Sequence, residues 1–84
     1  MKNKVIVELL VPELEHSYSL YLPISKRIGD IIQLLYKAVN DFNDVILGDV
    51  EKKALYNALS GQRYSPNDLL LNTDIRNGTR LVLM

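Results

Sequence analysis

Few side chains in this sequence could carry out chemistry, and their number and spacing argue against catalysis. His16 is the single histidine and there is no cysteine, so zinc, which takes about four nitrogen or sulfur ligands, has no expected site. No second histidine is present to build a triad with a serine or threonine. Glu13 and Glu15 fall in an expected exposed turn, where nothing favours general acid catalysis. We therefore expect no enzyme activity, and we interpret His16 as a solvated histidine at a hairpin edge.

Metal and phosphate sites are not expected either. The segment Asp41-Phe42-Asn43-Asp44 begins like a calcium loop, but Val45 occupies a ligand position and Ile46 replaces the required glycine. We interpret it as a solvated helix end. The four glycines lie singly, at positions 29, 48, 61 and 78, and do not form a phosphate cradle. The sequence predicts no cofactor and no metal.

Length and charge exclude several classes of partner. The 84 residues predict a single domain, 1–84. Ten basic and ten acidic side chains cancel, so no net field would steer the chain to nucleic acid. No run approaches the roughly 18 apolar residues of a membrane span. The basic start, Met1 to Lys4, resembles that of a signal peptide, but Glu8 interrupts the apolar run that follows and Pro12 ends it. We expect a cytoplasmic protein that neither binds nucleic acid nor inserts into a membrane.

Two strands are predicted at the start of the chain. Apolar residues alternate from Val5 to Val11, and Glu8 places the even-numbered positions outward. After a short connection, Pro12 to Glu15, a second alternation follows, in which Tyr18, Leu20 and Leu22 share one side and Ser17, Ser19 and Tyr21 the other. The two segments predict a β-hairpin.

One long helix is predicted where the period changes. Apolar side chains recur at helical spacing at Ile28, Ile32, Leu35 and Val39, and the stripe is widened by Ile31, Ala38 and Phe42. Two starts remain open. Ser25 could be the N-cap, but Lys26 and Arg27 would then oppose the positive end of the helix dipole. Alternatively, the helix begins near Ile28 with Asp30 in its first turn.

Turn signals dominate the second half of the chain. Asn40 to Lys53 is hard to interpret and allows an extra helical turn. Leu55 to Leu59 predicts a third strand whose inward side stays open, and Gln62 to Tyr64 predicts a short strand. Turns are expected at Ser60-Gly61, at Ser65 to Asp68 and at Asn77-Gly78, where both residues would supply positive φ.

The final segments complete a recognisable order of elements. Leu69 to Ile75 is expected to wrap under the sheet. In the last strand Thr79, Leu81 and Leu83 are expected to face the core, and Arg80, Val82 and Met84 to face outward. The order predicts an α+β fold of the β-grasp type, with a mixed four- to five-stranded sheet, one main helix packed on one face, and the first and last strands parallel at the centre.

A family resemblance becomes visible at this point. Gly61 to Tyr64, Leu70, Asp74-Ile75 and Thr79 to Leu83 resemble the ubiquitin pattern at matching spacing, and only the segment after the helix is several residues longer than in ubiquitin. Within the ubiquitin-like class, Val11-Pro12, Tyr18 to Pro23 and Ile75 to Leu81 are similar to the small bacterial YukD/EsaB proteins. These are accessory components of the type VII (ESX-like) secretion machinery of Gram-positive bacteria. The resemblance implies a cytoplasmic, non-conjugated protein that binds or regulates that machinery.

The sequence leaves three functions to compare. A ubiquitin-type modifier or a sulfur carrier needs a flexible tail ending in Gly-Gly, whereas this sequence ends at Met84 in the expected last strand. The first hypothesis is therefore a non-enzymatic, non-conjugated protein-binding module of type VII secretion. The second is a ubiquitin or sulfur-carrier type modifier, activated at its C-terminus after processing or through a methionine terminus. The third is a regulator of gene expression that acts through other proteins.

The expected binding surface is the outer face of the sheet. Strand parity brings together the apolar residues Ile6, Leu10, Tyr21, Val82 and Met84, with Arg80 at the edge as a rim contact. An exposed patch on the order of a few hundred Å² suggests a partner, either a secretion component or a second copy. Neutral exposure is the alternative, as is cover by the longer middle segment. Ala58 and Met84 stand where ubiquitin's own patch has isoleucine and valine, so partners of ubiquitin are not expected to bind.

Overall fold

The hairpin at the start of the chain follows from the alternation of its residues. In the computed structural model, which describes residues 3–43 and 48–84, β1 (Lys4–Val11) pairs antiparallel with β2 (His16–Pro23) without interruption. A short 3₁₀ turn, η1 (Pro12–Leu14), joins them, and Glu15 closes the turn in a left-handed conformation with φ of 53°. The predicted hairpin is confirmed.

The helix α1 (Ile28–Asn43) begins at the second of the two predicted starts. Asp30 lies in its first turn, where the helix dipole favours a negative charge. The first N–H groups of a helix have no partner within it; here Ile28 N donates to Asp68 O at 2.8 Å and Gly29 N donates to Pro66 O at 2.9 Å. A Cβ at position 29 would lie 3.2 Å from Pro66 O, so the close approach of this loop explains the glycine.

The extra helical turn that the sequence allowed between Asn40 and Lys53 is present as η2 (Val50–Lys52). The Asp49 side chain caps it by accepting a hydrogen bond from Glu51 N at 3.0 Å. Asp41 and Phe42 belong to α1, as the interpretation of a helix end requires. The expectations for Met1, Lys2 and residues 44–47, including the end of the calcium-like segment, lie outside the described residues.

The third strand differs from its prediction. β3 (Leu55–Asn57) ends two residues early, because the Asn57 side-chain oxygen accepts hydrogen bonds from Leu59 N at 2.8 Å and Ser60 N at 3.0 Å and turns the chain. The short strand predicted at Gln62 to Tyr64 is wrong: the segment contributes a single bridge between Tyr56 and Arg63. The inward side of β3, left open by the sequence, carries the buried Leu55.

The segment that leads into the last strand is as predicted, except at Asn77. The 3₁₀ turn η3 (Leu70–Asn72) lies within the predicted wrap, and β4 (Arg80–Leu83) follows the turn at Asn77-Gly78. Of that pair only Gly78 has a positive φ, 89°. Asn77 contributes through its side chain instead, because its Oδ1 accepts a hydrogen bond from Ile6 N at 2.9 Å.

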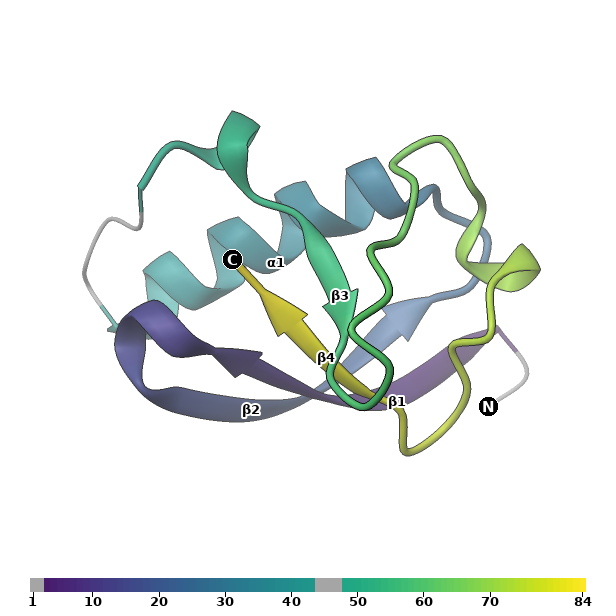
Figure 1. The fold of residues 1–84 in the computed structure, drawn as a ribbon, viewed down its shortest axis with the longest axis horizontal. Helices are drawn as coiled ribbons and strands as arrows, with labels where there is room; N and C mark the ends of the chain where they lie inside the picture. Colours follow the sequence, from purple (N-terminus) through teal and green to yellow (C-terminus); the bar gives the residue numbers. More distant parts are fainter. Residues whose placement is uncertain (1–2, 44–47) are drawn as a thin grey trace.

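The strands form one mixed sheet in the order β2-β1-β4-β3, with α1 across one face (Figure 1). β1 and β4 run parallel at its centre, with Leu9 opposite Leu81. The core lies between this sheet and α1, and its inward residues include Val7, Leu9, Val11, Leu22, Ile28, Ile31, Leu35, Val39, Leu81 and Leu83. The architecture confirms the predicted β-grasp fold, with four strands.

A candidate protein-binding face on the outer side of the sheet

The outer face of the sheet carries the six residues that the sequence assigns to binding. Even-numbered residues of β1 and β4 point away from the buried side, so Leu10 lies opposite Val82 and Glu8 opposite Arg80. On the same face, Ile6 of β1 lies opposite Tyr21 of β2. Ile6, Tyr21 and Met84 are 38%, 59% and 53% exposed. The described part of the middle segment therefore leaves these side chains open to solvent.

An ion pair divides this face into two apolar parts. Arg80 Nε lies 3.3 Å from Glu8 Oε1, and both side chains are well exposed, so the pair itself contributes roughly 0–1 kcal/mol to stability. On the outer face, this ion pair lies between the Ile6–Tyr21 pair and the Leu10–Val82 pair. Arg80 thus lies in the middle of the face, not at its edge as predicted, and Ile6 and Tyr21 are separated from the other apolar residues.

The sequence did not assign Tyr56 to this face. Tyr56 of β3 pairs with Val82 on the side away from Leu10, and it points outward because its neighbour Leu55 is buried. Ala58, which stands where ubiquitin's own patch has its isoleucine, lies in the turn after β3. The alternation of side chains in β3 would have placed Tyr56 on the outer face if the sequence had shown which side of that strand is buried. We call Leu10, Tyr56, Val82 and Met84 the apolar row.

Met84 is fixed in the apolar row by its main chain. Met84 N donates to Ala54 O at 3.1 Å, and Ala54 N donates to Met84 O at 2.8 Å. These two bonds continue the pairing of β3 with β4 by one step beyond Leu55 and Leu83. The Met84 side chain consequently has a defined place on the outer face.

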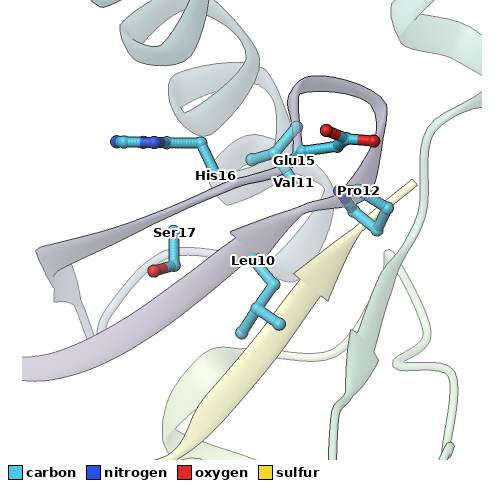
Figure 2. Close-up of a pocket in the computed structure, with 6 residues that line it drawn as sticks. All are labelled: Leu10, Val11, Pro12, Glu15, His16 and Ser17. Carbon is cyan, nitrogen blue, oxygen red and sulfur yellow. The ribbon is translucent and has the colours of Figure 1, made fainter.

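A hollow of about 290 Å³ adjoins the apolar row at the closed end of the hairpin. Leu10, Val11, Pro12, Glu15, His16 and Ser17 line it. Figure 2 shows Leu10 projecting from β1 beside β4, with the His16 ring and the Glu15 carboxylate extending in opposite directions. His16 is exposed and meets Tyr18 edge to face, with ring centroids 4.7 Å apart. Because Leu10 belongs to both features, the hollow extends the row toward η1.

An ion pair holds the hairpin end beside the segment that follows α1. Lys53 Nζ donates to Glu13 Oε1 at 2.6 Å, and Gly48 N donates to Glu13 Oε2 at 3.2 Å. The hydrogen bonds from Lys53 and Gly48 stabilise the carboxylate and lower the pKa of Glu13 below 4.5. This contact fixes the position of η1, and with it one wall of the hollow.

Tyr64 has the most perturbed titration among the described residues. Its hydroxyl donates to Asp74 Oδ1 at 2.6 Å and accepts from Asn57 Nδ2 at 3.1 Å. Burial, followed by the hydrogen bond to Asp74, raises the pKa of Tyr64 to about 12. The tyrosine connects β3 to the loop before β4, and we interpret its shift as structural.

The described ranges contain neither a cluster of metal ligands nor a membrane-spanning helix. Within 3–43 and 48–84, no three His, Cys, Asp or Glu side chains lie together so as to hold a metal ion. No helix in that part of the chain is long and apolar enough to cross a bilayer.

Comparisons with known proteins identify the fold. No protein-family model and no curated protein matches the sequence. Among solved structures, the EccD5 ubiquitin-like domain from Mycobacterium xenopi is 21% identical with a TM-score of 0.76, over 96% of this chain and 92% of that one. A ubiquitin-like domain from Arabidopsis thaliana is 13% identical with a TM-score of 0.73, over 98% and 77%. A chain of an ESX-5 inner membrane complex is 15% identical with a TM-score of 0.72, over 98% of this chain but 21% of that one.

At these identities the likeness shows the fold alone. The chain has the ubiquitin-like β-grasp fold, with one helix on a four-stranded mixed sheet. Because this fold carries many unrelated functions, function has to be argued from the surface.

Proposed function

We propose that this protein is a non-enzymatic, non-conjugated ubiquitin-like binding module that acts in the cytoplasm as an accessory component of bacterial type VII secretion. The apolar row and its adjoining hollow carry the proposal. The apolar row lies on the face of the sheet that α1 does not cover, and the hollow adjoins it at Leu10, so the side chains of the row are available to a partner. An apolar patch rimmed by polar groups is typical of a protein-binding surface.

Two likenesses support the choice of pathway. Val11-Pro12, Tyr18 to Pro23 and Ile75 to Leu81 are similar in sequence to the YukD/EsaB proteins. The fold is also that of the EccD5 ubiquitin-like domain and of part of a chain in an ESX-5 inner membrane complex. Both point toward a partner that is itself a secretion component.

The face is suited to a partner with one apolar projection and nearby charges. Burial of Leu10, Val82 and Met84 would be favourable at about 25 cal/mol per Å² of apolar surface. The hollow beside Leu10 can accept a side chain. Glu8 and Arg80, next in line along the sheet, would set the orientation of the partner through complementary charge.

Calorimetric titration with the cytoplasmic part of a type VII secretion ATPase from the same organism tests the proposal. We expect Val82→Asp to weaken binding at least ~10-fold while the circular dichroism spectrum is unchanged, because the side chain lies outside the core. Leu71→Asp is the matched control: Leu71 is an exposed leucine in η3, and binding should persist. Loss of binding in neither variant, or equally in both, would show that the docking surface is misplaced.

The non-conjugated part of the proposal has its own test. The main chain of Met84 is hydrogen bonded to Ala54 in both directions, so this residue is part of the sheet and its side chain belongs to the apolar row. Intact mass spectrometry of the protein purified from its own cells should show an unmodified chain. A covalent adduct through the C-terminus would replace this proposal with that of a modifier.

A further inference from the structure

The two edges of the sheet differ in how they are protected. The edge strand β3 has three residues, and the following loop covers it through the Tyr56–Arg63 bridge and a hydrogen bond from Tyr64 N to Leu55 O at 2.9 Å. The other edge strand, β2, has eight residues. Within 3–43 and 48–84 no strand pairs with its outer side. β2 is therefore the open edge of the described sheet.

The hydrogen bonds that β1 makes on its β4 side show which main-chain groups of β2 point outward at this edge. Glu8 N donates to Thr79 O at 3.1 Å and Ile6 O accepts from Gly78 N at 2.9 Å, so even-numbered residues of β1 direct their N–H and C=O toward β4. In an antiparallel ladder the residues opposite them direct theirs outward. Those residues are Tyr21, Ser19 and Ser17, opposite Ile6, Glu8 and Leu10.

This open edge lacks the features that normally block pairing. Natural edge strands carry charged side chains, prolines or bulges that oppose the addition of another strand. Between His16 and Leu22 there is no Asp, Glu, Lys, Arg or Pro, and the register with β1 has no bulge. Pro23 stands only at the end of the strand. The edge can accept a further strand.

We propose that β2 pairs antiparallel with β2 of a second copy of this chain, about a two-fold axis that passes between the two Ser19 residues. The pairing sets Ser17 against Tyr21 on the outer face and Tyr18 against Leu20 on the helix side. Each large side chain thus meets a different and compatible neighbour, and no like charges come together. The zero net charge of the chain removes long-range repulsion between the copies.

The second copy fits this edge better than an arbitrary extended peptide. An incoming strand must present apolar side chains on the helix side, where Tyr18 and Leu20 pack against the core and the exposed Phe42 ring lies 5.8 Å from that of Tyr18. On the outer face it must present a side chain that fits beside the small Ser17 and a small side chain beside Ser19, and in the second copy these are Tyr21 and Ser19. β2 itself has this pattern. The dimer would place both helices on one side of a continuous sheet and both apolar rows on the other.

Disulfide cross-linking tests the axis directly, because the chain has no cysteine of its own. At a two-fold hydrogen-bonded pair the two Cα atoms are about 5.5 Å apart, within the range of about 4.4–6.8 Å that a disulfide spans. Ser19→Cys should form a disulfide-linked dimer under mild oxidation. Ser17→Cys is the matched control on the same strand, where the two copies of residue 17 would be more than ~13 Å apart and should stay uncross-linked. Absence of the Ser19→Cys dimer, or equal cross-linking of both variants, overturns the proposal.

Sedimentation equilibrium with charge variants provides a second readout. Ser19→Lys and Ser19→Glu should each be monomeric, because like charges meet at the axis, and their equimolar mixture should regain the dimer. Ser19 is exposed, so both variants retain the fold, which circular dichroism checks. A wild-type chain that stays monomeric throughout, including one that binds an extended peptide at β2, contradicts the proposal.

Discussion

The two faces of the sheet show how one step along a strand changes the role of a residue. Leu9 and Leu81 point toward α1 and have no exposed surface. Their neighbours Leu10 and Val82 pair in the same two strands but point to the opposite side, where no helix covers them. Side chains alternate along a strand, so the inner residue serves folding and the outer one is available for recognition. This separation makes the two roles testable one at a time.

Truncation of an inner residue should have the largest effect on stability. We expect Leu81→Ala to lower the free energy of unfolding by roughly 2–5 kcal/mol, because it leaves a cavity in the core. That is a large share of the roughly 5–15 kcal/mol typical of a folded domain. Urea denaturation followed by circular dichroism measures it. Val82→Ala, on the outer face of the same strand, should cost about 1 kcal/mol or less; equal losses would remove the distinction between the faces.

Substitutions on the outer face should change binding more than they change stability. We expect Val82→Asp to weaken the affinity for the secretion partner at least ~10-fold, or about 1.4 kcal/mol, with little change in melting temperature. Ile6→Asp should have a smaller effect, because the Glu8–Arg80 pair separates Ile6 from the apolar row. Isothermal titration calorimetry compares the two variants. If both lose the same affinity, the whole outer face is one surface and the division by the ion pair is irrelevant to binding.

The buried Tyr64 should make the free energy of unfolding depend on pH in the alkaline range. Its pKa is about 12 when folded and about 10 when unfolded, so the fold favours the protonated hydroxyl. That contribution is fully present below about pH 10 and is lost as the pH rises toward 12. Tyr64→Phe should cost about 1 kcal/mol at neutral pH, through the hydrogen bonds to Asp74 and Asn57, and should reduce the alkaline loss.

The control for this prediction comes from the outer face. Tyr21 is exposed, so Tyr21→Phe should leave the free energy of unfolding unchanged. Unfolding by urea at several pH values above neutrality compares the two variants. A wild-type chain whose stability is flat across the alkaline range would contradict the role assigned to Tyr64.

The contact of Glu13 with Lys53 should produce the smallest effect. The folded pKa of Glu13 is lowered from 4.5 by its hydrogen bonds, so its contribution is present above pH 4.5 and is lost as the pH falls through the lower folded value. Glu13→Gln should make the melting temperature less sensitive to acid. Glu15→Gln, at the other end of the same turn, is the matched control. The same acid dependence in both variants would rule out the contact as its source.

The sequence predicted the features that depend on local periodicity. Alternation at Val5 to Val11 and at Leu81 and Leu83 determined which side of each strand is buried, because a shift of one residue would expose the apolar set. The helix start near Ile28 was one of two alternatives, because Lys26 and Arg27 would oppose the helix dipole in a helix that began earlier. Features set by a single side-chain hydrogen bond, or by contacts between distant segments, were not predicted. The end of β3 depends on the Asn57 side chain, and the place of Arg80 depends on the parallel register of β1 with β4.

The candidate site was predicted in part for the same reason. Parity placed Leu10, Val82 and Met84 on the outer face, which the structure brings together at one end. Tyr56 was missed because a strand of three residues is too short for its own alternation to show. The hollow beside Leu10 depends on the left-handed conformation of Glu15 in the hairpin turn, which the sequence did not indicate.

Nuclear magnetic resonance tests the central claim, that the outer face recognises the partner, most directly. Uniformly ¹⁵N-labelled protein would be titrated with the cytoplasmic part of the secretion ATPase while the backbone amide signals are followed. We expect the largest shifts and broadening at Leu10, Tyr56, Val82 and Met84, with the exposed side of α1 unaffected. Changes confined to α1 or to the loop between β3 and β4 would contradict the account.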